Sequence, residues 1–285
     1  MQRREDLATN KEFLRSIADN DYEIPAGIDH FTFAKALLEN LASVDSELRD
    51  ELSYMILASG IIDRQKLTIP QLEKLLESTL DENHLFYRIG EAGADSVFMR
   101  SFSNLIVAAI LYTDTRNPQL PEDAVHKVKI ALFDYARREK DWRGYVSGKG
   151  WGHAMAHLAD ALDQLAQHPA ASQAEREEVM MLVSELAKMP VPLYNEEDVR
   201  LATIAYHIIL GKQVAEEFLE SWLQACFVAR DADVASWTSA TNSKNFLRSL
   251  YFLLLWDNMA LVLVEKISDL LRRQDAVYLE KGGEQ

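Results

Sequence analysis

The sequence predicts an all-α protein, built as a HEAT/armadillo-like right-handed solenoid of antiparallel helix pairs. Apolar residues recur at the three- and four-residue spacing of helices, and the alternation typical of strands is almost absent. Only 11 Gly and 7 Pro occur in 285 residues, too few for the many tight turns of a sheet protein. In the second half, leading helices are expected near residues 96, 149, 195 and 242, close to the roughly 40–47-residue period of two-helix repeats.

Local signals place the individual helices. Pro70 and Pro121 each fit the first turn of a helix, where the missing N–H has no intrahelical acceptor. Asn195 precedes three acidic residues, which is typical of an N-cap at the positive end of a helix. The expected starts lie near Asp29, Ser46, Pro70, Ser96, Pro121, Lys149, Gln173, Asn195, Gln213, Asn242 and Asn258. The expected stops lie at Asn117-Pro118, His168-Pro169, Met189-Pro190 and Gly211.

We expect one continuous domain over residues 1–285, because no Ser-, Gly- or Pro-rich linker divides the chain. Residues 1–90 show irregular helix pairs and are predicted to form an N-terminal helical cap over an apolar end. Residues 91–280 are predicted to form the stacked pairs, which bury their apolar stripes against one another. Residues 281–285 are expected to be a frayed tail.

The charge balance narrows the range of partners. The formal net charge is −15, so long-range repulsion disfavours nucleic acid and anionic membranes. The longest apolar runs, 105–112 and 250–256, are shorter than the roughly 20 residues that span a bilayer. The first residues are charged and lead into no apolar stretch, so we expect no signal peptide and a cytoplasmic protein.

Cys226 is the sole cysteine, so no intrachain disulfide can form. We interpret it as a small buried hydrophobe.

One glycine-rich segment, residues 141–160, departs from the rest of the chain. Four glycines fall within nine residues, and between Arg137 and Lys149 five basic residues, Arg143 and Lys149 among them, stand against two acidic ones. A glycine-rich loop that leads into a helix N-terminus can present backbone N–H groups to an anion. The spacing does not fit a phosphate-binding P-loop, because no Ser or Thr follows Lys149 and no strand is expected before it. The segment therefore predicts an anion site of another kind.

The helix expected after this loop carries two faces. Trp151 belongs to its apolar stripe, and His153, His157 and Asp160 lie on the other face. Two histidines at i and i+4 with an acid one turn on could hold a divalent metal, although no metal or other cofactor is assigned. The glutamate of the HExxH metalloprotease motif is absent. Hydrogen bonding to a ligand, and purely structural histidines, remain open alternatives.

The other leading helices carry further polar candidates: Arg100, Arg200, His207 and Arg248. If these helices stack in register, the arginines face one hollow with the histidines and favour a carboxylate or phosphate ligand. The alternative is that each arginine pairs with a buried acid. The acids considered for that role are Asp114, Asp160, Glu197 and Asp257.

These residues also carry a family resemblance, over roughly residues 30 to 275. The block from Arg143 to Asp160 resembles the signature of a bacterial family catalogued as domain of unknown function 2785. The segments 95–103 and 245–251 resemble its flanking motifs, and Gly152 stands where alanine is more common. The resemblance implies an all-helical, solenoid-like bacterial protein and implies no activity.

The sequence favours a helical-repeat protein that binds a small anionic ligand or an acidic peptide in a concave pocket. The first alternative is an enzyme that uses a metal or a histidine on a phosphate- or carboxylate-bearing substrate. The second is a protein-interaction scaffold, since solenoids often bind partners on their inner surface. Ligand identity, reaction, pathway and oligomeric state do not follow from the sequence.

Overall fold

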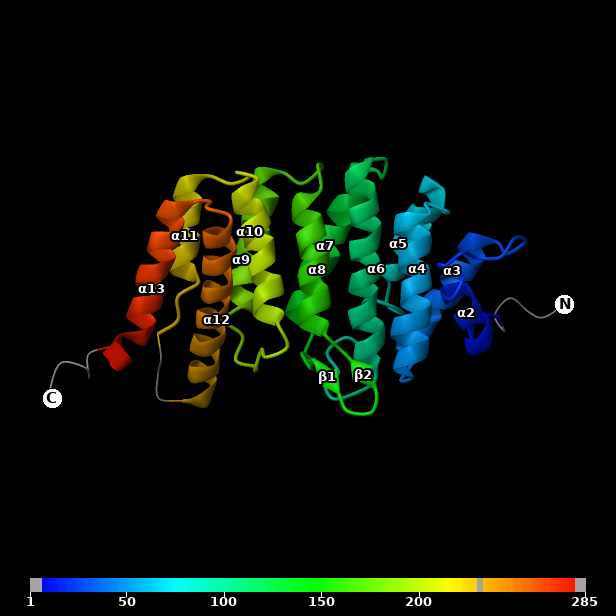
Figure 1. The fold of residues 1–285 in the computed structure, drawn as a ribbon, viewed down its shortest axis with the longest axis horizontal. Helices are drawn as coiled ribbons and strands as arrows, with labels where there is room; N and C mark the ends of the chain where they lie inside the picture. Colours follow the sequence, from blue (N-terminus) through cyan, green and yellow to red (C-terminus); the bar gives the residue numbers. More distant parts are fainter. Residues whose placement is uncertain (1–6, 230–232, 280–285) are drawn as a thin grey trace. The chain divides into compact units, whose positions relative to one another are not determined.

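The computed structural model describes residues 7–229 and 233–279 and is all-α apart from one short hairpin (Figure 1). Residues 281–285, expected to be a frayed tail, lie outside this range. The contacts within the chain divide it into two compact units, Met1–Ala170 (unit 1) and Ala171–Gln285 (unit 2). Their boundary does not coincide with residue 90, so the division into cap and stack stays a prediction.

Unit 1 begins with short helices and continues with three long ones. The long helices are α6 (Ser96–Arg116), α7 (Glu122–Arg138) and α8 (Ala154–Gln167). Helix α6 packs most extensively against α8 and is buried along most of its length. The short elements that precede it are α2 (Lys11–Ala18), α3 (His30–Glu39), η1 (Asn40–Ala42), η2 (Glu47–Tyr54), α4 (Met55–Ala58), η3 (Ser59–Asp63) and α5 (Ile69–Thr79).

Two of these short elements, η2 and η3, are π-helices on either side of α4. A π-helical turn holds one residue more than an α-helical turn and occurs often at functional sites. In η2, this backbone carries the fully buried Arg49. The sequence predicts a helix start near Ser46, but nothing in it predicts the π conformation.

Unit 2 consists of five helices within its described residues. Helix α10 packs mainly against α12, and α9 packs against both α10 and α11. The bounds are α9 (Gln173–Leu186), α10 (Glu197–Leu210), α11 (Glu216–Ala225), α12 (Val234–Trp256) and α13 (Leu261–Leu279). The N-terminus of α9 has a capping box, in which the Ser172 and Glu175 side chains each accept from the other residue's backbone N–H.

Two expected helix starts are wrong. The expected start near Lys149 falls in a β-hairpin, because the backbone there adopts positive φ angles at Gly148 and Gly150, and α8 begins at Ala154. The expected start near Asn242 lies two turns inside α12, which begins at Val234. Its N-cap is Asp233, whose side chain accepts a hydrogen bond from the Ser236 N–H.

Helix α6 is long and apolar enough to cross a membrane by length and composition, and it alone among the described helices meets that test. Within the fold, 83% of its apolar window is buried. This burial is what a core helix of a globular protein requires.

Candidate functional site

The glycine-rich segment forms a tight β-hairpin in front of α8. Strand β1 (Tyr145–Val146) pairs antiparallel with β2 (Gly150–Trp151). Gly148 and Gly150 have φ angles of +74° and +85°, which side chains other than glycine rarely allow. The glycines therefore make a tight turn, and the anion site expected in this segment stays a prediction.

The exit from the hairpin is fixed by backbone contacts. The Gly144 carbonyl accepts hydrogen bonds from the N–H groups of Gly152, at 2.7 Å, and His153, at 3.2 Å. A Cβ on Gly152 would lie 3.1 Å from the Arg143 carbonyl oxygen, so glycine allows this close approach. His153 then adopts a left-handed conformation, with φ 48° and ψ 35°, directly before α8.

Arg49 holds the hairpin from inside unit 1. Its side chain is 0% exposed. The guanidinium donates to the carbonyls of Ser43 at 2.7 Å, Lys149 at 2.9 Å and Trp151 at 3.4 Å. Its Nε lies 2.6 Å from an oxygen of Asp50. One buried cation thus joins the π-helix to the end of the hairpin turn and to β2.

The surroundings of Arg49 are apolar. Its guanidinium lies 4.0 Å from the ring centroid of Phe98 and 5.0 Å from that of Phe102. Burial lowers the pKa of Arg49 and raises the pKa of Asp50, because removal from water disfavours both charges. A Cβ on Gly150 would lie 2.8 Å from the Ser46 Cβ, so the hairpin packs tightly on this region.

A second buried arginine, Arg100, organises the approach to the hairpin. It forms a bidentate ion pair with Glu139, with distances of 2.7 and 2.8 Å, and both side chains are 0% exposed. The same guanidinium donates to the carbonyls of Tyr87 and Glu91, and Glu139 accepts from the Asp141 N–H. Arg100 was expected to face a ligand; it pairs instead with a buried acid, and we leave it out of the proposed site.

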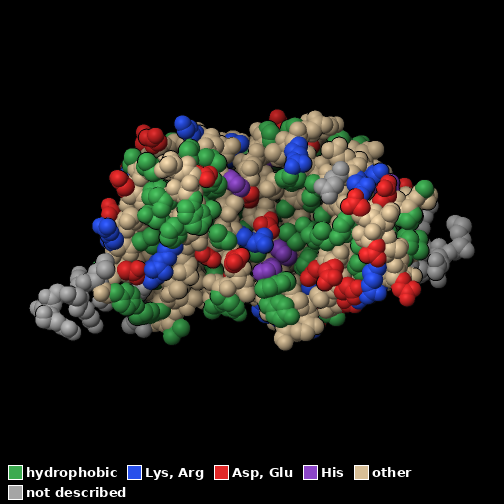
Figure 2. All heavy atoms as spheres, viewed as in Figure 1, with side chains coloured by type: hydrophobic (Ala, Val, Ile, Leu, Met, Phe, Trp, Pro, Cys, Tyr) green, Lys and Arg blue, Asp and Glu red, His purple; other side chains and the backbone are tan. Residues whose placement is uncertain are grey.

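The two basic residues of the hairpin segment also meet acids. Arg143 donates to Asp141 at 2.5 and 2.7 Å and to the Ala94 carbonyl at 2.7 Å. The hydrogen bond to Asp141 raises the pKa of Arg143. The Lys149 Nζ lies 2.6 and 2.7 Å from the two carboxylate oxygens of Asp95, and both side chains are partly exposed. Figure 2 shows the same pattern more widely, with basic side chains next to acidic ones on the drawn face.

His157 is buried on α8 and oriented by a hydroxyl group. Its Nδ1 lies 2.8 Å from Oγ of Ser101, and Ser101 donates its proton to the Gly152 carbonyl. A hydroxyl has one proton, so the contact with His157 requires a hydrogen on Nδ1. The ring of Phe102 packs edge-on against the imidazole at 4.9 Å. The tautomer and orientation of His157 are therefore set by groups on α6 and the hairpin.

Aromatic rings continue from the hairpin to α8. The rings of Trp151 and His153 stack at 4.0 Å with an interplanar angle of 4°, and Tyr145 packs edge-on against Trp151 at 5.1 Å. Tyr145 is 57% exposed and Trp151 40% exposed. His153 lies 5.6 Å from His157 between ring centroids. The hairpin thus presents a rigid, partly exposed aromatic surface.

Asp160 lies on α8 about one turn beyond His157 and is half-buried. Within the described residues, no group of three or more His, Cys, Asp or Glu side chains is placed to hold a metal ion. Cys226 is buried, and burial raises the pKa of its thiol to about 12, so the side chain is a neutral thiol at neutral pH.

The remaining candidates lie in unit 2. Arg200 is exposed on α10, and His207 is half-buried on the same helix. Arg248 is exposed on α12 and lies 3.2 Å from Asp275, which also pairs with Lys244 at 3.0 Å. The expected hollow that joins these residues to those of unit 1 stays a prediction.

The structure therefore brings together Arg143, Lys149, Trp151, His153 and His157 around one hairpin. Sequence reasoning missed the residues that position them, which are Arg49, Asp95, Ser101, Glu139 and Asp141. Asp95 and Ser101 do lie in the flanking motif 95–103, which was a usable signal. Arg49 lies outside every motif that we recognised.

Fold and site together define an all-helical protein with a rigid hairpin held in front of a core helix. The profile of a family described as "Protein of unknown function (DUF2785)" matches residues 85–252, and the chain belongs to that family. This confirms the resemblance, over a shorter range than 30–275. Comparisons with curated proteins and with solved structures gave no significant match.

Proposed function

We propose that this protein binds a small anionic ligand, or an acidic peptide segment, where the hairpin meets α8. One observation carries the proposal: the Lys149 ammonium group already holds a carboxylate, that of Asp95, with both oxygens within 2.7 Å. The pair is partly exposed, with 38% of the Lys149 side chain and 45% of the Asp95 side chain accessible. A ligand carboxylate or phosphate can take the place of Asp95.

The energetic balance supports such an exchange. An exposed ion pair contributes only about 0–1 kcal/mol to stability, so a ligand anion displaces it at small cost. The hairpin does not need to reorganise on binding, since Arg49 holds it through Lys149 and Trp151 carbonyls.

Thermal unfolding with added anions tests the proposal. Inorganic phosphate and an end-capped oligoglutamate peptide should each raise the melting temperature above that in sodium chloride of equal ionic strength. Lys149→Ala should abolish this gain. Asp95→Asn should enlarge it, because it removes the competing carboxylate.

Lys127→Ala is the matched control, since Lys127 also forms an exposed pair, with Asp123 at 2.7 Å, on α7. It should leave the anion effect unchanged. Equal losses in Lys149→Ala and Lys127→Ala, or no anion effect on the wild type, would overturn the proposal. The phosphate and peptide arms separate a small ligand from an acidic segment.

A histidine-dependent enzyme is a second candidate, and the contact between Ser101 and His157 favours it. A fixed tautomer is what a general base requires. Hydrolysis of p-nitrophenyl phosphate or p-nitrophenyl acetate that His157→Gln removes would support this candidate. Elemental analysis of the purified protein tests the metal-dependent version, and the absence of zinc, manganese and iron would remove it.

A protein-interaction scaffold is a third candidate, favoured by exposed apolar side chains in unit 2. Phe252 and Trp256 on α12 are 46% and 75% exposed, and Leu261 and Val262 on α13 are 52% and 68% exposed. Light scattering at increasing protein concentration, with Trp256→Ser as the variant, tests self-association through this surface.

We also propose that the helices form a HEAT-like repeat and that the protein is cytoplasmic. The packing of α6 on α8 and of α10 on α12 supports a repeat, because these are the expected leading helices. An experimental structure that fixes the two units relative to each other tests it. Cell fractionation tests the location.

A further inference from the structure

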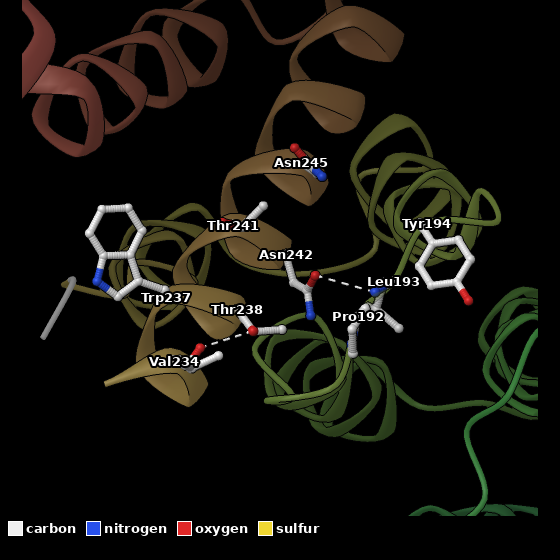
Figure 3. A pocket seen from close by; sticks show the side chains of 9 residues that line it. All are labelled: Pro192, Leu193, Tyr194, Val234, Trp237, Thr238, Thr241, Asn242 and Asn245. Atoms are coloured by element: carbon white, nitrogen blue, oxygen red, sulfur yellow. Dashed lines mark hydrogen bonds between the residues drawn. The ribbon is translucent and has the colours of Figure 1, made fainter. Parts of the chain in front are cut away.

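Unit 2 contains an open groove that no residue of the proposed anion site lines. We call it the Trp237–Tyr194 groove, and its volume is about 690 Å³. Figure 3 shows Trp237 and Tyr194 on opposite sides, with α12 between them. Its lining residues are Pro192, Leu193, Tyr194, Val234, Trp237, Thr238, Thr241, Asn242 and Asn245.

One wall of the groove is held rigidly by a buried amide. Asn242, 3% exposed on α12, donates to the carbonyls of Met189 at 2.8 Å and Val191 at 2.7 Å. Its side-chain oxygen accepts from the Leu193 N–H at 3.4 Å. These three bonds fix the segment that carries Tyr194 against α12, so the groove exists before any ligand binds.

Of the other polar side chains in the groove, one hydrogen-bonds within its own helix and two are left unused by the described part of the chain. The Thr238 hydroxyl donates to the Val234 carbonyl within α12. The Thr241 hydroxyl and the Asn245 amide, four residues apart on the same helix, make no side-chain hydrogen bond to any described residue. Figure 3 shows both beside the groove, between the two aromatic rings. They leave donors and acceptors for a ligand.

The described lining offers no opposite charge to a charged ligand. None of the nine residues is charged, although charged residues make up 26% of the chain. The groove is shallow, since Tyr194 is 78% exposed and Val234 82% exposed. A small molecule needs a site that encloses most of its surface, whereas an extended chain binds to an open groove.

We infer that this groove binds an uncharged, proline-rich peptide segment in the polyproline II conformation. The described lining residues provide no free strand edge for β-augmentation, no arginine cluster for a phosphorylated motif and no continuous apolar floor for an amphipathic helix. Separated aromatic rings with a neutral hydrogen-bond donor between them match a polyproline II ligand. Its proline rings stack on the aromatic rings, and its backbone carbonyls accept a hydrogen bond from the donor. Trp237 and Tyr194 supply the rings, and Asn245 supplies the donor.

Calorimetric titration of the whole protein with an end-capped decaproline peptide tests this inference. We expect binding by the wild type at concentrations up to millimolar, and at least tenfold weaker binding by Trp237→Ala and Asn245→Ala. Trp256→Ala is the matched control, because it removes an exposed tryptophan from the same helix outside the groove. It should bind as the wild type does.

Two further ligands sharpen the result. An uncharged Gly-Ser peptide of equal length should not bind, because it lacks rings and a preformed conformation. Absence of decaproline binding, equal losses in Trp237→Ala and Trp256→Ala, or binding of a neutral oligosaccharide in its place would overturn the inference. Lys149→Ala should leave decaproline binding unchanged, so the two proposals can fail separately.

Discussion

Nη2 of Arg49 donates a hydrogen bond of 2.9 Å to the carbonyl of Lys149, across 100 residues of sequence. A π-helix near the start of the chain thereby determines where a hairpin lysine lies. This lysine is the cation on which the proposed anion site depends. Removal of a buried cation such as Arg49 lowers the stability of the fold strongly, because all of its hydrogen-bond partners lose their donor at once.

Replacement of Arg49 by Met should destabilise the protein by about 3–5 kcal/mol, because Asp50 is left partly buried without its cation and two hairpin carbonyls lose their donor. Chemical denaturation measures this change. Lys127→Met, which removes one positive charge at an exposed position, should cost less than about 1 kcal/mol. Similar values for the two variants would contradict the role given to Arg49.

Gly150→Ala should be more damaging than Gly148→Ala, although both glycines have positive φ. At Gly148 a Cβ meets no atom within 4 Å, so we expect only the conformational cost, about 1–2 kcal/mol. At Gly150 the Cβ would lie 2.8 Å from the Ser46 Cβ and 3.0 Å from Nη2 of Arg49. An additional cost of about 1–3 kcal/mol should appear in the free energy of unfolding. If Gly148→Ala proves equally costly, the close packing is not what matters.

His153→Gly should stabilise the protein and weaken anion binding. The left-handed backbone of His153 is strained for a residue with a side chain, so glycine should gain up to about 1 kcal/mol. Loss of the ring that stacks on Trp151 should reduce the effect of phosphate on the melting temperature. His153→Ala, which keeps the strain and loses the ring, separates the two effects. If His153→Gly is less stable than the wild type, the stacking of the His153 ring stabilises the fold by more than its left-handed backbone destabilises it.

Helix α2 should lose protection from amide exchange in acid. Hydrogen bonds from Arg15 and Lys11 lower the pKa of Glu47 from 4.5 to about 2. A lowered acid pKa stabilises the fold above pH 4.5, and this contribution disappears as the pH falls toward 2. Exchange rates in α2, corrected for intrinsic rates, should therefore rise across this interval. Glu47→Gln should flatten the dependence, and an unchanged profile in that variant would assign it to other groups.

Much of the fold was predictable because the signals are local. The starts near Asp29, Ser96 and Gln173 agree with α3, α6 and α9, and the side chains of Asp29 and Ser172 cap α3 and α9 within one turn. The start of α12 was misplaced because its first turns are rich in Ser and Thr, which have low helix propensity. The all-α class follows from periodicity, but the hairpin does not, since its anchor lies 100 residues away.

For the candidate site, the sequence identified the basic residues and the histidine but not their acidic partners. Glycine spacing and local charge identified Arg143, Lys149 and His153 as unusual. Their partners escaped prediction because contacts such as Lys149 with Asp95 join residues 54 apart in sequence. Charge counting from Arg137 to Lys149 treats this stretch as basic, whereas in space Asp95, from outside it, pairs with Lys149.

The π-helix over Glu47–Tyr54 makes the length of this stretch as important as its composition. Deleting a single residue there, such as Glu51, would restore α-helical winding and turn everything on its N-terminal side by about 100°. Arg49 would then point away from the carbonyls it serves. Side chains around this turn can be exchanged without altering the winding, but a change in residue count should uncouple the residues before it from the hairpin.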